Sequence, residues 1–369
     1  MSILIFVVIL LVLVLVHEWG HFFTAKKFGI RVDEFGFGFP PRALKLFKKG
    51  ETLYTLNWLP IGGFVKIFGE NPDDENTNGP DKDRSFVNKP RWQQAIVLFA
   101  GVFMNFILAW VLFSVGLFSG MPMSVQNAPE SYNIQDSNLM IISISPSSPA
   151  EKAGLESRDK IVYLGAGEDD FIEAPNITPE VLKDFIITHP KNEIEIGYLR
   201  GKDNVMNIAL VTPELKDEKP LIGVSSDVIG IVKLPLLSSF VEGMNVTLSA
   251  TKDTAFGLYS LIANGIKGTG SFDSVTGPVG IVKLVGSAAS FGFIYLLSFA
   301  AYISINLAII NLVPFPALDG GRLLFLLIEK IKGSRINAKF ANYANMIGFG
   351  ILILLMVVVT YHDIVKLVK

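Results

Sequence analysis

The chain of 369 residues contains no cysteine, only four histidines and few charged residues, and each scarcity excludes a class of protein. Without cysteine there is no disulfide framework and no metal site built on thiolates. Charged residues make up 18%, below the quarter or so that is usual for soluble domains. The net charge of −2 leaves no basic excess, so nucleic acid is not an expected partner.

Half of the residues are hydrophobic, and many gather in uncharged stretches near or above the roughly 20 residues that span a bilayer as helix. The four stretches are Ser2–Phe23, Ala95–Phe118, Leu284–Leu318 and Phe340–Tyr361. The first has no basic start and no small-residue cleavage site, so we interpret it as a retained helix. The pattern predicts a polytopic α-helical membrane protein with four transmembrane helices and a lipid bilayer as its surroundings.

Lysine and arginine predict the topology. Residues 25–92 hold 12 of them, whereas the longer segment 119–283 holds 13 together with 21 Asp and Glu. The short connection between the third and fourth stretches is also basic. Because basic short connections stay on the inner side, we expect the N-terminus and the long segment outside.

The sequence therefore divides into seven parts. These are a first helix at 1–24, a connecting segment at 25–92 in which the resemblance described below implies a β region and a loop, a second helix at 93–118, an outer α+β domain at 124–228, surface helices and a Gly-Pro-Val-Gly loop at 229–283, a third helix with its following turn at 284–322, and a fourth helix at 340–362. The outer domain is predicted from short apolar runs between turn signals, with helices after Pro149 and Pro179. Leu236–Ile266 carries three charges and is predicted to be one or two surface helices rather than a fifth span.

The first apolar stretch contains His17-Glu18-Trp19-Gly20-His21, an HExxH motif. Residues four apart share a helix face, so both imidazoles can reach one Zn²⁺, and Glu18 is placed to accept a proton from water. Ionisable residues within an apolar span are functional by default. A polar pocket without metal is the alternative, but it leaves Glu18 unexplained.

A catalytic zinc site needs a third protein ligand. His189 lies in the predicted outer domain and His362 at the outer end of the last helix, so the topology excludes both. Two prolines and then Asp319 follow the third span, at the inner depth expected for His17, about 22 Å into a core of about 30 Å. Asp319 is the candidate, and an ordinary turn aspartate before glycine is the alternative.

At these residues the chain resembles the site-two proteases, a family of intramembrane zinc metalloproteases, in their bacterial RseP-like branch. The resemblance rests on the HEWGH motif and on Asn311-Leu-Val-Pro-Phe-Pro-Ala-Leu-Asp319-Gly-Gly-Arg322, and it continues through Gly36–Pro41, Pro60–Lys66, Gly101–Asn105 and Gly277–Ile281. It implies that His17, His21 and Asp319 bind zinc and that Glu18 is the catalytic base.

The resemblance also implies a membrane-associated β-hairpin region whose free edge could pair with a substrate. The expected substrate-binding residues are Gly62, Gly63, Phe64, Val65, Asn306 and Asn311. An ordinary solvent-facing hairpin is the alternative for the strands, and contacts between helices are the alternative for Asn306. For Asn105, helix packing is the expectation.

Ser148–Leu155 followed by Asp159 resembles a PDZ domain, with Arg158 where glycine is usual before the aspartate. Leu221, Ile222, Gly223 and Val224 match the carboxylate-binding loop, in the circularly permuted bacterial order. The chain has room for one such domain. It would either capture a C-terminus through backbone amides or filter substrates by size, and the sequence leaves both open.

The resemblance implies hydrolysis of transmembrane segments of single-pass membrane proteins, namely anti-sigma factors or remnant signal peptides. It places the enzyme in a bacterial inner membrane with its active site near the cytoplasmic side. A scaffold with a structural metal is disfavoured by the intact Glu18 and the open fourth ligand position. A metal-ion transporter would need polar residues along several spans.

Overall fold

The computed structural model describes residues 1–71, 73–125, 132, 134–167, 170–201, 205–216, 219–268 and 276–368. The chain forms two compact units. The first unit comprises residues 1–114, 240–289 and 296–369, and the second comprises residues 115–239 and 290–295. Each unit contains a hydrophobic cluster of its own.

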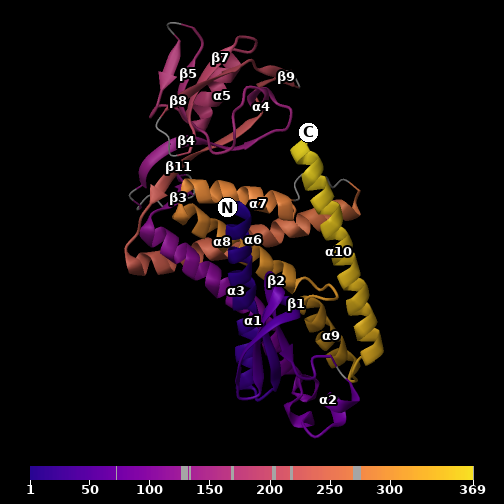
Figure 1. The fold of residues 1–369 in the computed structure, drawn as a ribbon. Coiled ribbons are helices and arrows are strands. Elements are labelled where there is room, and N and C mark those ends of the chain that lie inside the picture. Colours follow the sequence, from indigo (N-terminus) through magenta and orange to yellow (C-terminus); the bar gives the residue numbers. More distant parts are fainter. Residues whose placement is uncertain are drawn as a thin grey trace. The chain divides into compact units, whose positions relative to one another are not determined.

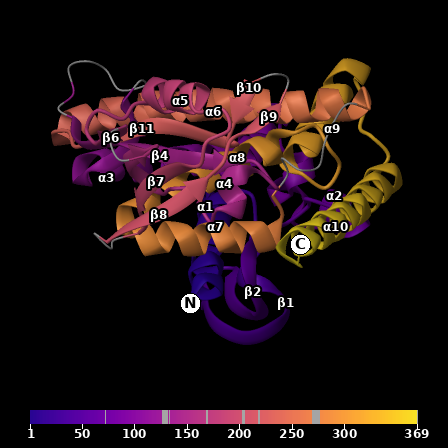
Figure 2. The same cartoon turned by 90° about the horizontal axis from the view of Figure 1, so that it is seen from above.

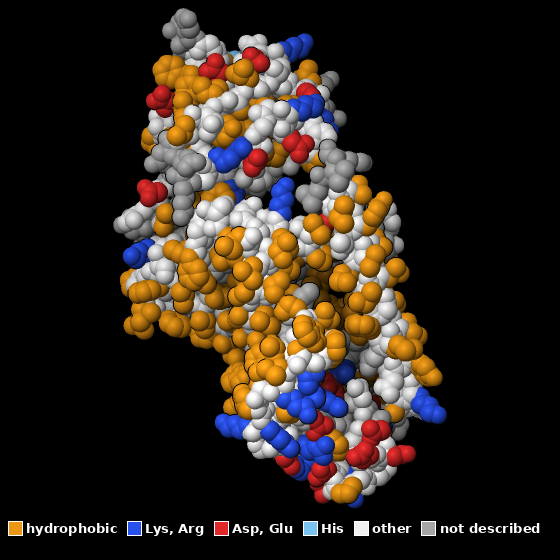
Figure 3. Space-filling model, in the orientation of Figure 1, with side chains coloured by type: hydrophobic (Ala, Val, Ile, Leu, Met, Phe, Trp, Pro, Cys, Tyr) orange, Lys and Arg blue, Asp and Glu red, His pale blue; other side chains and the backbone are white. Residues whose placement is uncertain are grey.

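Four helices in the described part of the chain are long and apolar enough to cross a membrane, as predicted. They are α1 (Ser2–Lys27), α3 (Arg91–Ser119), α8 (Phe293–Leu312) and α10 (Ala338–Val368) (Figure 1). Figure 3 shows the surface over α1, α3 and α10 to be largely hydrophobic, whereas charged side chains gather over β1, β2 and α2. Such a surface suits a polytopic membrane protein.

The third apolar stretch is not continuous, which corrects the prediction that one span begins at residue 284. Helix α7 (Pro278–Phe291) ends before Gly292, and α8 begins at Phe293. Gly292 has a φ of +122°, which a residue without Cβ adopts at little cost. The charged segment 236–266 forms one helix, α6 (Leu236–Ile266), which is not a candidate span.

A carboxylate ties α10 to the start of α7. Asp363 is 5% exposed and accepts hydrogen bonds from Gly277 N at 3.1 Å and Gly280 N at 2.8 Å. First-turn amides of a helix have no partner within the helix, so a carboxylate there stabilises the end of α7. This contact accounts for the Gly-Pro-Val-Gly segment of the sequence.

Strands β1 (Val32–Lys49) and β2 (Thr52–Ile67) pair antiparallel and lie against α1 (Figures 1 and 2). Both bend sharply, so that Phe35 pairs with Val65 on one side and with Tyr54 on the other. Residues 63–66 therefore form an outer segment of the sheet. A short helix α2 (Asp74–Asn78) and two 3₁₀ turns (Lys82–Arg84 and Phe86–Asn88) lead to α3.

The second unit has an α+β fold. Its main sheet has the order β3-β11-β4-β5-β7-β8, with β6 paired to β5, and β9 and β10 form a separate ladder. The strands are β3 (Met121–Ser124), β4 (Ile134–Ile144), β5 (Lys160–Gly165), β6 (Phe171–Glu173), β7 (Ile194–Leu199), β8 (Met206–Val211), β9 (Glu214–Lys216), β10 (Lys219–Leu221) and β11 (Val224–Val232). Four of these strands, β4, β5, β7 and β8, overlap the short apolar runs from which the domain is predicted, at Leu139–Ile144, Lys160–Leu164, Glu193–Leu199 and Val205–Leu210.

Two helices of this unit begin as the sequence predicts. Helix α4 (Pro149–Lys152) is capped by the Ser148 hydroxyl, and α5 (Pro179–Thr188) by the Thr178 hydroxyl. Arg158 has a φ of +77°, the left-handed conformation that glycine adopts at the least cost. Within the predicted outer domain, residues 126–131, 133, 168–169, 202–204 and 217–218 lie outside the described residues.

Candidate metal centre

His17 and His21 project from the same face of α1, as their spacing predicts. Their ring centroids are 4.7 Å apart, and their Nε2 atoms are separated by 3.1 Å. The two residues are only 6% and 7% exposed. Two imidazoles thus share one small buried site.

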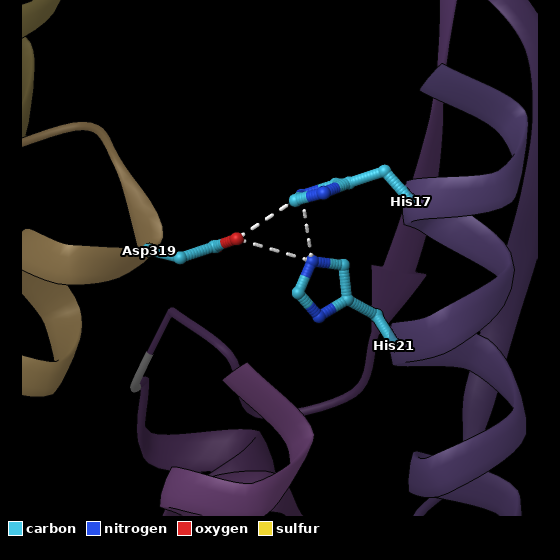
Figure 4. Close-up of side chains that lie close together, drawn as sticks. All are labelled: His17, His21 and Asp319. Carbon is cyan, nitrogen blue, oxygen red and sulfur yellow. Dashed lines mark hydrogen bonds and ion pairs between the residues drawn. The ribbon is translucent and has the colours of Figure 1, made fainter. Parts of the chain in front are cut away.

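Asp319 completes the cluster from the first residue of α9 (Asp319–Lys332). Its Oδ2 lies 3.1 Å from His17 Nε2 and 3.2 Å from His21 Nε2 (Figure 4). Candidate ligand atoms of the three residues all lie within 4.8 Å of one another. The expected third ligand is therefore beside the two histidines.

The loop between α8 and α9 positions Asp319. Prolines 314 and 316 end α8, and the amide of Ala317, whose φ is +74°, donates to Asn345 Oδ1 of α10 at 3.1 Å. A side chain at Gly320 would overlap the carbonyl oxygens of Leu312 and Val313. The glycine after Asp319 thus lets α9 begin directly against the end of α8.

The outer nitrogens of both rings have buried partners. His21 Nδ1 lies 2.8 Å from the Val97 carbonyl, which can only accept, so the proton sits on Nδ1 and the Nε2 lone pair is free. His17 Nδ1 lies 3.3 Å from Asn105 Nδ2, while Asn105 Oδ1 is buried and has no hydrogen-bond partner among the described residues. Exchanging the oxygen and nitrogen of that amide gives Oδ1 the proton of His17 Nδ1 and frees His17 Nε2.

This arrangement fits zinc. Two imidazole nitrogens and one carboxylate oxygen are ligands of a catalytic zinc site, and such histidines hold their other N–H on a carbonyl or an amide oxygen. The unpaired Asn105 oxygen is explained if His17 Nε2 is a ligand.

Two glycines allow α1 and α3 to approach closely at this level. A Cβ on Gly20 would lie 2.8 Å from the Ala100 carbonyl carbon. A Cβ on Gly101 would lie 2.7 Å from His21 Cε1 and 2.8 Å from His17 Cε1. Ordinary contact begins at 3.4 Å, so neither position has room for a side chain.

Glu18 faces a pocket of about 430 Å³ that also contains the three-residue cluster. Its Oε2 accepts a hydrogen bond from Val65 N at 3.0 Å, which joins the helix to the outer segment of β2. Arg322 and Glu70 form an ion pair at the wall of this pocket.

The predicted substrate-binding residues divide into two groups. Gly63, Phe64, Val65 and Asn311 line the pocket, and Gly62 adjoins them in β2 with a φ of +83°. Asn306 is not among the residues that line the pocket, and its amide donates to the Tyr302 carbonyl of its own helix at 2.8 Å. Its contact with substrate stays a prediction.

Leu221, Ile222, Gly223 and Val224 join β10 to β11 in the second unit. Gly223 has a φ of +80°, and its carbonyl accepts from Ser145 N at 2.8 Å. The Ile222 carbonyl accepts from Ala150 N at 3.0 Å. The loop is thus fastened to the segment that begins α4.

Sequence reasoning missed the roles of Asn105 and Gly101 in supporting the histidines. Asn105 is fully buried, and its carbonyl accepts from Ser304 Oγ of α8 at 2.8 Å. A polar residue and a glycine four apart in an apolar span were the available signal.

Many zinc peptidases carry an HExxH helix, and the apolar helices around this one restrict the class to membrane metallopeptidases. The sequence profile of peptidase family M50 matches residues 5–355. The chain belongs to this family, the site-two proteases, whose cofactor is zinc, and it is a zinc metallopeptidase.

Its relatives are bacterial. A Clostridium perfringens protein named as a candidate zinc metalloprotease is 36% identical over 360 residues, covering 96% of this chain and 95% of that protein. The regulator of sigma-W protease RasP of Bacillus subtilis is 31% identical over 448 residues, and the zinc metalloprotease RasP of Shouchella clausii is 31% identical over 444. Each alignment covers 99% of both chains. The relatives and the apolar helices indicate a bacterial membrane protein.

Proposed function

We propose that this chain is an intramembrane protease that cuts transmembrane segments of single-pass membrane proteins, with zinc held by His17, His21 and Asp319. The convergence of these side chains, from two elements 300 residues apart in sequence, is the observation that carries the proposal. Anti-sigma factors are the expected substrates because the Bacillus subtilis relative is named a regulator of sigma-W protease, and remnant signal peptides are a second class.

Bound zinc would polarise the scissile carbonyl and lower the pKa of water. Glu18 accepts the proton of the attacking water and returns it to the leaving amine. Val97 and Asn105 hold the imidazoles in the tautomers that ligation requires.

The outer segment of β2 is the proposed site of substrate alignment. A transmembrane helix has to unwind before its amides can be cut, and an unpaired strand edge offers replacement hydrogen bonds. Gly63, Phe64 and Val65 border the pocket that contains Glu18, which supports this role. Asn311 is proposed as a further contact to the substrate backbone.

The second unit is proposed to be a single PDZ domain outside the inner membrane that filters or captures substrates. The glycine-containing loop at 221–224 and the α+β fold are consistent with it. The proposed orientation puts the N-terminus on the same outer side and the metal centre near the cytoplasmic face, on the basis of the basic segment 25–92.

The proposal is tested with purified protein and a reporter whose transmembrane segment is cut. Glu18→Gln is expected to retain zinc and lose cleavage by at least about 100-fold, since general-base catalysis contributes 10²–10⁴. Asp319→Ala is expected to lower zinc occupancy as well. Glu242→Gln, which changes a half-buried carboxylate on α6 outside the metal-centre pocket, is the control. Cleavage by the Glu18→Gln variant at the normal rate would refute the assignment.

A further inference from the structure

A second cavity, of about 670 Å³, lies on the face of α1 away from the metal centre. At about 100° per residue, Val12, Val16 and Trp19 point roughly opposite to His17 and His21. The cavity is an open groove between α1 and α3, both candidate membrane spans, and aromatic side chains of β1 and β2 close one end. Its principal lining residues are Val12, Trp19, Phe22, Met104, Leu108 and Val111.

The chemistry of the walls excludes a peptide strand as the occupant. The lining is aliphatic and aromatic, and only Trp19 and Tyr54 carry a polar side-chain atom. An extended peptide would leave its amides and carbonyls without partners, at several kcal/mol for each group in an apolar medium.

The groove is too small to enclose a helix. A helix about 10 Å across that rises 1.5 Å per residue fills about 120 Å³ per residue, so the volume holds fewer than two turns. A flexible hydrocarbon chain has neither difficulty, because it needs no hydrogen bonds and follows an irregular wall.

The length of the groove matches one leaflet. Val12 and Phe22 are ten residues apart on α1, about 15 Å, which is half of a hydrocarbon core of about 30 Å. Lys26 lies one further turn along α1, at head-group depth, with its Nζ 6.0 Å from the centre of the Phe22 ring. Lys27 follows it.

The charges near Lys26 favour an anionic ligand. Glu51 is the nearby carboxylate whose pKa is lowered by Arg84 first and by Lys26 to a smaller extent. Since Glu51 forms an ion pair with Arg84, it does not neutralise Lys26 by direct contact.

We propose that this groove binds an anionic phospholipid, with one acyl chain between α1 and α3 and the phosphate at Lys26. Trp19 belongs both to the groove and to the HExxH turn. The lipid therefore packs against the turn of α1 that also carries Glu18.

The test uses the full chain purified in detergent and given phosphatidylglycerol or phosphatidylcholine with the same acyl chains. Retained lipid is counted by native mass spectrometry. We expect about a five-fold preference for phosphatidylglycerol, the factor for one basic residue at a membrane surface. Lys26→Gln should remove the preference, and Leu108→Trp should abolish retention of both lipids.

Matched controls lie on α10. Leu354→Trp adds the same bulk to an exposed apolar position, and Lys339→Gln removes a charge elsewhere, so both should bind lipid like the parent chain. Val111→Trp fills the other end of the groove and replaces Leu108→Trp if that variant fails to fold. Unchanged retention in a folded groove-filling variant would overturn the proposal. Equal binding of the two lipids, or displacement by an apolar transmembrane peptide, would also overturn it.

Discussion

Replacement of Gly101 by alanine should weaken zinc binding without destabilising the metal-free protein. The added Cβ would lie 2.7 Å from His21 Cε1 and 2.8 Å from His17 Cε1, whereas ordinary contact begins at 3.4 Å. The His17 ring therefore has to retreat by at least about 0.6 Å, and the His21 ring by more, because His21 Nε2 lies closer still to the added Cβ. These shifts are at least about three times the 0.2 Å tolerance of metal–ligand distances. The change acts on both imidazoles together.

The expected size follows from that displacement. Loss of a single supporting contact weakens metal binding 10–100-fold, so displacing two ligands should cost at least about 100-fold. At a zinc concentration 100 times the parent Kd, bound zinc stabilises the parent by about 2.7 kcal/mol. The Gly101→Ala variant would keep about 0.4 kcal/mol of this, while its metal-free form gains up to about 1 kcal/mol of helix propensity.

The assay is thermal unfolding with and without zinc, together with zinc affinity from chelator competition. Gly350→Ala is the matched control, since it is a helical glycine in α10 with no atom within 4 Å of its Cβ position. Gly20→Ala should differ from both, because its Cβ meets the backbone of Ala100 and destabilises the protein with or without zinc. Parent-like zinc affinity in Gly101→Ala would refute the reasoning.

Three further changes have expected outcomes. Asn105→Leu should lower zinc affinity 10–100-fold in chelator competition with an unchanged fold, and parent-like affinity would contradict its role beside His17. Asp363→Ala should lower the free energy of unfolding by about 2–3 kcal/mol, because Gly277 and Gly280 lose a charged acceptor. A loss no greater than for the half-buried control Glu242→Gln would contradict this. Arg158→Gly should slow hydrogen exchange in β4 and β5 up to about five-fold by relieving a positive φ, and faster exchange would show that its contact with the Phe291 ring matters more.

The parts that could be predicted from the sequence are those set by local periodicity. Helix geometry alone puts His17 and His21 on one face of α1, and the apolar lengths alone give four long helices. Asp319 was found by matching depth across a membrane, which works because a helix rises by a fixed distance per residue. The family resemblance supplied the same residue independently.

The sequence gives less information on two features: the direction in which a side chain points around its helix, and the position at which an apolar helix is interrupted. Asn306 and Asn311 are five residues apart, about 140° around a helix, so their side chains point in different directions and only Asn311 lines the pocket that the structure describes. Asn105 contacts His17 because the face of α3 that carries Asn105 packs against α1. The residue pattern of α3 does not predict which of its faces packs against α1. The break at Gly292 was missed because a lone glycine inside an apolar run is usually tolerated.

The hydrogen bond from the Val65 amide to Glu18 has a consequence for the order of events in catalysis. An amide hydrogen bonds well to one acceptor at a time, so a peptide carbonyl that docks on Val65 must displace the carboxylate of Glu18. The displaced carboxylate would then be free to accept a proton within the pocket that it shares with the histidines. Docking of the peptide and release of the Glu18 carboxylate would then occur together. Without substrate, Glu18 would stay hydrogen-bonded to the Val65 amide.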